Sequence, residues 1–60
     1  MLGKNVADYA RALYEAQGDK AEAEAAQKMV AAEEAGKADE VAQWRAIREA
    51  VRALRGANQG

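Results

Sequence analysis

The apolar positions of this chain recur every three or four residues, in three segments that glycines separate. Such spacing gathers apolar side chains on one face of an α-helix. No segment alternates apolar and polar residues over the length of a strand, and the chain contains no proline. The pattern predicts an all-α fold of three antiparallel helices, spanning about residues 5–17, 19–35 and 38–55, in a small bundle or as a hairpin plus a third helix.

Glycines mark the expected ends of the helices. Gly18 and Gly36 each precede a charged residue, and glycine favours helix ends because it adopts a positive φ at low cost. Gly56 is expected to end the third helix in the same way. The sequence therefore predicts one domain over residues 1–56, followed by a disordered tail over 57–60.

Polar residues that commonly cap helices stand at the expected helix starts. Asn5 precedes the first helix, where its side chain can accept a hydrogen bond from a free backbone N–H group. Asp19 occupies the same position before the second helix, with Glu22 three residues later, which predicts a capping box.

The apolar faces predict how the helices pack. The second helix carries mostly alanine, with Met29 and Val30 as its only large apolar residues, so it can approach its neighbours closely. We expect Trp44 to fill the contact between the second and third helices, near Met29. The face of the first helix comprises Leu2, Val6, Tyr9, Leu13 and Ala16, and that of the third comprises Val41, Trp44, Ile47, Val51 and Leu54.

The chain has 60 residues and no cysteine or histidine. A domain of this size buries only about 60% of the surface that its unfolded chain exposes, and without those residues neither a disulfide nor a metal site is expected to add stability. We therefore predict a homo-oligomer, a dimer, through Trp44, Ile47, Val51 and Leu54. The other side of the third helix has only small residues, namely Ala42, Ala46, Ala50 and Ala53. This side could either make a second close helix contact or face the solvent.

Charge is unevenly distributed, with an acidic middle and a basic end. A stripe of four arginines runs along the third helix: Arg45, Arg48, Arg52 and Arg55. One interpretation is intramolecular, with Arg48 and Arg52 pairing with Glu22 of the second helix. The other is a docking surface for an acidic protein partner or for nucleic acid. A sequence pI of about 5.3 and the lack of interleaved aromatic residues do not favour nucleic acid.

The sequence does not favour an enzyme. It lacks Cys, His, Ser and Thr, which supply most nucleophiles and zinc ligands. Adjacent carboxylates such as Glu33 and Glu34 point about 100° apart on a helix and do not converge. No cofactor motif is present, and no apolar run is long enough to span a membrane. We expect a cytoplasmic, non-enzymatic interaction or assembly module, with a nucleic-acid-binding regulator that uses the arginine stripe as the alternative.

Two resemblances bear on this expectation. Tyr14, Gly18, Asp19 and Ala23 resemble a tetratricopeptide helical hairpin, although Arg11 stands where that motif has a small residue. Over about residues 7–55 the chain is similar to short uncharacterised all-helical proteins of alphaproteobacteria, except that Lys37 replaces an acid. This second resemblance implies a bacterial helical domain and no activity; it rests on Gly18, Asp19, Ala26, Gln27, Gly36, Trp44, Arg45, Ile47 and Leu54.

Overall fold

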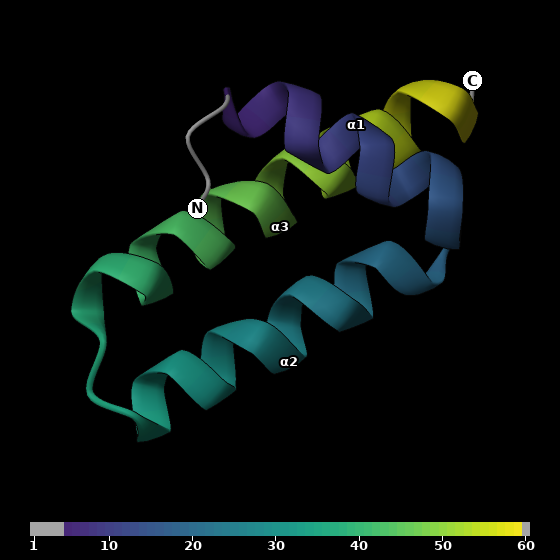
Figure 1. The fold of residues 1–60 in the computed structure, drawn as a ribbon. Coiled ribbons are helices and arrows are strands. Elements are labelled where there is room, and N and C mark those ends of the chain that lie inside the picture. Colours follow the sequence, from purple (N-terminus) through teal and green to yellow (C-terminus); the bar gives the residue numbers. More distant parts are fainter. Residues whose placement is uncertain (1–4, 60) are drawn as a thin grey trace.

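The chain folds into three helices, as Figure 1 shows. The computed structural model describes the backbone of residues 5–59 and the side chains of residues 5–56. The helices are α1 (Val6–Gln17), α2 (Lys20–Glu34) and α3 (Ala38–Gln59). No strand occurs within residues 5–59, so the predicted all-α class is confirmed. Leu2, which was expected on the apolar face of the first helix, lies outside the described residues.

The turn between α1 and α2 depends on Gly18. The Asn5 side chain caps the start of α1 as predicted, accepting a hydrogen bond from the Ala7 N–H at 2.7 Å. At the other end of α1, Gly18 has φ 61° and ψ −131°. Its positive φ was expected, but its ψ lies outside the left-handed helical region, in a part of conformational space that only glycine enters easily.

The predicted capping box at the start of α2 is wrong. Asp19 makes no side-chain capping hydrogen bond. Its backbone is helical, with φ −63° and ψ −19°, whereas a capping side chain needs an extended backbone to reach back to the first turn. The carboxylates of Asp19 and Glu22 instead face arginines of α3.

The turn between α2 and α3 has the hydrogen bonds of a Schellman motif. Gly36 has φ 72°; its N–H donates to the Glu33 carbonyl at 3.1 Å, and the Lys37 N–H donates to the Ala32 carbonyl at 2.9 Å. These two bonds satisfy carbonyl groups that the end of a helix leaves free. Gly36 therefore ends α2 as predicted.

Gly56 does not end α3. The helix continues through it to Gln59, and Gly56 does not have a positive φ. A glycine inside a helix costs about 1 kcal/mol relative to alanine, which weakens a helix without breaking it. The predicted end of the third helix at Gly56 is therefore wrong, whereas the division into a domain over 1–56 and a tail over 57–60 stays a prediction.

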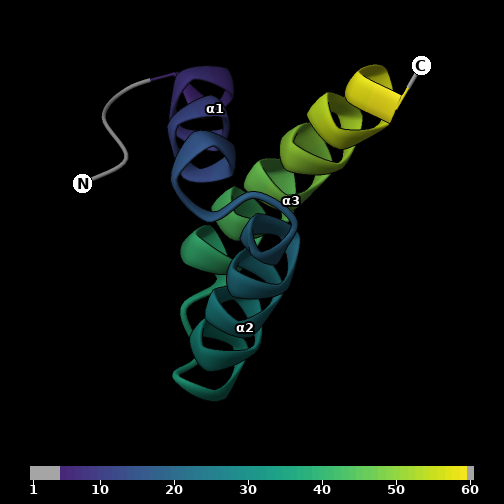
Figure 2. The same ribbon diagram turned by 90° about the vertical axis from the view of Figure 1, so that its right-hand side faces the viewer.

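The core lies where α3 packs against both other helices. α1 and α2 share a smaller interface with each other than either shares with α3. Figure 2 shows the C-terminal end of α3 extending away from α1 and α2. Four alanines let the helices approach closely around three larger residues of α3; the buried set is Ala10, Ala21, Ala25, Ala32, Trp44, Ile47 and Val51.

Trp44 is a core residue, as predicted, with 8% of its surface exposed. Met29 packs against the same cluster. The tryptophan also contacts α1, which the sequence did not indicate: its ring meets Tyr9 edge to face, with 5.8 Å between the centroids. Such pairs add about 0.5–1.5 kcal/mol beyond the buried area.

The buried face of α1 agrees with the predicted one at Val6 and Leu13, which pack against the core, and differs from it elsewhere. Ala10 is fully buried, while Tyr9 is partly exposed at the edge of the core and Ala16 is exposed. Ala10 lies about 100° around the helix from Tyr9, so α1 is rotated relative to the expectation from its large residues. A methyl side chain at Ala10 allows close contact, which the hydrophobicity pattern does not reveal.

Candidate interaction surface on α3

The arginine stripe divides into two pairs. Arg48 and Arg55 lie at the edge of the core with 39% and 41% of their side chains exposed, and we call them the inner arginines. Arg45 and Arg52 are exposed, and we call them the outer arginines. Within each pair the two residues are seven apart, so they share a side of the helix, and about 60° separates the pairs.

Glu22 of α2 holds both inner arginines. Its side chain is only 19% exposed. Arg55 donates from Nη1 to Glu22 Oε1 at 2.9 Å, and Arg48 Nε lies 3.9 Å from Oε2. Arg55 Nε also lies 3.8 Å from Asp19 Oδ1 at the surface. One half-buried carboxylate therefore fixes two cations that are two helical turns apart.

The predicted pairing of Glu22 is confirmed for Arg48 and wrong for Arg52. Arg55 takes the second place, and it was not predicted as a partner. A signal for it existed, because residues 48 and 55 are seven apart and lie about 20° apart on the helix. Arg52 lies about 60° around the helix from Arg55, and although it lines a depression together with Glu22, it lies beyond 4.0 Å of that carboxylate.

The outer arginines have no ion-pair partner within 4.0 Å among residues 5–56. Glu49 lies between them in sequence and is also exposed. The outer arginines and Glu49 therefore form a charged surface that the fold leaves open to a partner.

Two shallow depressions flank the inner arginines. One, of about 350 Å³, is lined by Glu22, Arg52, Arg55 and Gly56. The other, of about 270 Å³, lies between α2 and α3 beside Asp19, Glu22 and both inner arginines. Glu22 lines both, so an anion entering either depression would meet a carboxylate as well as guanidinium groups. This arrangement suits an internal ion-pair cluster better than a small-anion site.

Three of the four residues predicted to mediate self-association are not on the surface. Trp44, Ile47 and Val51 are buried within one chain, so a second copy cannot use them. Leu54 is half-buried and lines a groove of about 270 Å³ together with Ala7, Arg11, Ala50 and Ala53. Of the alanine side of α3, Ala50 packs against the core, whereas Ala42, Ala46 and Ala53 are exposed.

The side chains described at residues 5–56 include no buried polar or charged residue. Nor does this part of the chain hold a group of three or more Asp or Glu residues that could bind a metal ion. None of the three helices, as far as the structure describes them, is long and apolar enough to cross a membrane. The charged residues that could contact a partner therefore lie at the surface or at the rim of the core.

No protein-family model, curated protein or solved structure matches this chain significantly. The resemblances to the tetratricopeptide hairpin and to alphaproteobacterial helical proteins therefore stay predictions.

Proposed function

We propose that this protein is a non-enzymatic interaction module that docks an acidic segment of a protein through its outer arginines. The observation that carries the proposal is the division of the arginine stripe. Glu22 pairs with both inner arginines and Asp19 also pairs with Arg55, whereas Arg45 and Arg52 are exposed and lie beyond 4.0 Å of any carboxylate in the described part. Two arginines seven residues apart span about 10.5 Å, the spacing of two turns of a partner helix.

The chemistry around the outer arginines favours a protein partner over nucleic acid. Glu49 lies between them, and it would repel a continuous row of phosphates but can pair with a cation in a segment of mixed charge. Nonspecific nucleic-acid binding depends on several cations that act together. The outer arginines supply only two such cations.

The available side chains also favour binding over catalysis. The sequence has no Cys, His, Ser or Thr, so a reaction would depend on carboxylates. The most enclosed carboxylate at the site, Glu22, is already held by two guanidinium groups. A carboxylate in that position is engaged within the molecule, where it links α2 to α3.

Titrations of isotope-labelled protein, followed by NMR chemical shifts, test the proposal. A short polyglutamate peptide should shift the amides around residues 45–52 in a saturable way. The double variant that carries both Arg45→Gln and Arg52→Gln should not show these shifts. The variant Lys20→Gln with Lys28→Gln is the matched control, because it removes two exposed cations from α2. It should bind as the wild type does.

A parallel titration with a short DNA duplex tests the alternative function. Tighter, saturable binding of the duplex at the same amides would replace the protein-docking proposal with a nucleic-acid-binding regulator. No shift with either probe would refute docking at the outer arginines.

A further inference from the structure

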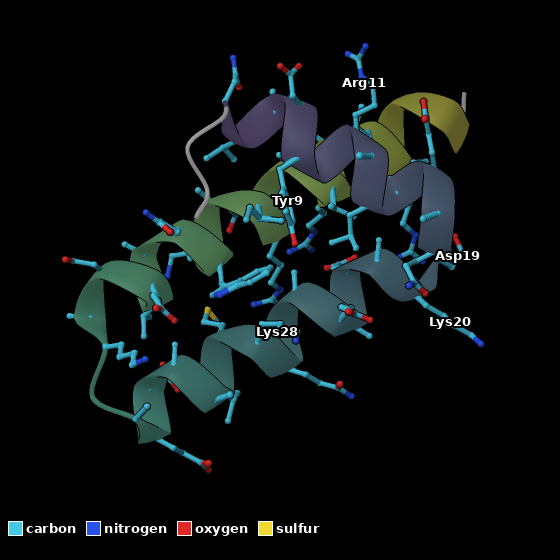
Figure 3. The ribbon with its side chains drawn as sticks, in the orientation of Figure 1. Tyr9, Arg11, Asp19, Lys20 and Lys28 are labelled. Carbon is cyan, nitrogen blue, oxygen red and sulfur yellow. The ribbon has the colours of Figure 1, made fainter. Side chains whose placement is uncertain are left out.

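The outer face of α1 carries three charged side chains, Asp8, Arg11 and Glu15, which we call the acidic strip. All three are exposed, and none takes part in an ion pair within the described residues. Asp8 and Glu15 lie about 20° apart on the helix and about 150° from the buried Ala10, so they point away from the core. Figure 3 shows Arg11 extending from α1 away from α2, and Arg11 also lines the groove beside Ala50, Ala53 and Leu54 of α3.

The open face of α3 carries the reverse arrangement of charges. Arg45, Glu49 and Arg52, which we call the basic strip, are exposed and likewise outside every ion pair of residues 5–56. Glu49 lies about 180° around the helix from the mean direction of the buried Ile47 and Val51. The basic strip therefore also points away from the core.

The two strips match in length and in order of charge. Each has two like charges seven residues apart, about 10.5 Å along the helix, with one opposite charge between them. When the strips face each other, Asp8 and Glu15 meet the two arginines, and Arg11 lies within about one residue rise of Glu49. Both helix directions bring opposite charges together at the two ends, because the ends of each strip have the same sign.

We propose that the basic strip of one copy binds the acidic strip of a second copy. This inference rests on the proposed function and names its partner: the acidic segment is α1 of another molecule of the same chain. Within one molecule the strips cannot meet, because they lie on different helices and both point outward. The contact is heterologous and leaves one strip of each kind free, so the chain forms open assemblies or rings.

Two variants separate the two halves of the contact. Asp8→Asn with Glu15→Gln keeps only the basic strip, and Arg45→Gln with Arg52→Gln keeps only the acidic strip. In sedimentation analysis each variant alone should remain at the 6.4 kDa monomer mass, because neither can supply both surfaces. An equimolar mixture should form a complex of about twice that mass, which cannot grow further. Wild-type protein should increase in mass with concentration beyond the dimer.

Matched controls remove the same charges elsewhere. Glu33→Gln with Glu34→Gln, and Lys20→Gln with Lys28→Gln, change exposed residues of α2 and should leave wild-type association unchanged. Circular dichroism should give the same helix content for every variant. Because the Debye length falls from about 10 Å at 0.1 M salt to about 3 Å at 1 M, high salt should dissociate the wild-type assembly.

Three results would overturn the inference: wild-type protein that stays monomeric at every concentration, a half-strip variant that associates as the wild type does, or a mixture that stays monomeric. If the wild type is monomeric while polyglutamate still shifts residues 45–52, only the second copy is excluded as the partner. If polyglutamate fails as well, the docking function of the outer arginines is refuted with it.

Discussion

The two faces of α3 use similar residues for opposite purposes. The closed face, with Ile47 and Val51 fully buried, has the inner arginines at its edge, where they pair with Glu22 and Asp19 of the segment that begins α2. The open face has the outer arginines, which are exposed and outside the ion pairs of residues 5–56. A rotation of about 60° around the helix separates the two pairs. The role of an arginine here follows from its angle to the core, because only one side of α3 meets a carboxylate of α2.

The largest expected effect comes from removing a side chain of the closed face. Ile47→Ala should lower the free energy of unfolding by about 2–5 kcal/mol, because it leaves a cavity in a fully buried position. A 60-residue protein has a total stability of about 3–9 kcal/mol, so the variant should be largely unfolded or close to it. Urea denaturation followed by circular dichroism measures the change.

The matched control for Ile47→Ala lies on the open face. Ala53→Ser changes an exposed position of the same helix and should alter stability by less than about 0.5 kcal/mol. Equal losses in the two variants would contradict the division of α3 into a closed and an open face.

The next prediction compares the effect on stability of replacing two glycines, Gly56 within α3 and Gly18 in the turn between α1 and α2. Gly56→Ala should stabilise the protein by about 0.5–1 kcal/mol, because Gly56 lies within α3 and an added Cβ meets nothing within 4 Å. Gly18→Ala should instead destabilise by about 1–3 kcal/mol, because φ 61° and ψ −131° strain a residue with a Cβ. Thermal denaturation of both variants measures the opposite signs, and a loss of stability in Gly56→Ala would show that α3 ends there.

A smaller effect concerns the ion-pair cluster of the inner arginines. Glu22→Gln should cost about 0.5–1 kcal/mol at this partly exposed site, because Arg48 loses its charged partner and Arg55 keeps only Asp19. The loss should shrink in 1 M salt, where the Debye length is about 3 Å. Glu33→Gln removes an exposed carboxylate of α2 and serves as the control in the same denaturation experiment; a loss as large as that of Glu22→Gln would mean that the cluster adds nothing specific.

The smallest expected effect on stability belongs to the outer arginines. Arg45→Gln with Arg52→Gln should change the free energy of unfolding of the dilute monomer by less than about 0.5 kcal/mol, because neither side chain has a partner in the described fold. The same variant should lose polyglutamate binding. A loss of stability comparable to that of Glu22→Gln would place the outer arginines in the closed face after all.

Local sequence signals were enough to predict the helices. Three such signals are the spacing of apolar residues every three or four positions, the cap at Asn5 and the glycines at 18 and 36. Each acts over one or two helical turns, so it can be recognised without knowing how the helices pack. The closed face of α3 was predictable for the same reason, because Trp44, Ile47 and Val51 are large apolar residues on one side of a helix. Gly56 shows the limit of this reasoning, since a glycine that can end a helix can also continue one.

Tertiary packing decided which residues are buried and which charges pair, because both depend on the rotation and register of whole helices. Val6 and Leu13 of α1 pack against the core as predicted, but the buried Ala10 was not predicted, because a small residue can permit close contact without signalling it through hydrophobicity. The register of α2 against α3 places Glu22 within hydrogen-bond distance of Arg55, and Arg52 has no ion pair with it. The reason is that a shift of three residues along a helix changes the direction of a side chain by about 60°. The sequence by itself determined that four arginines form a stripe; only the packed helices determined which two are neutralised inside the molecule and which two face outward.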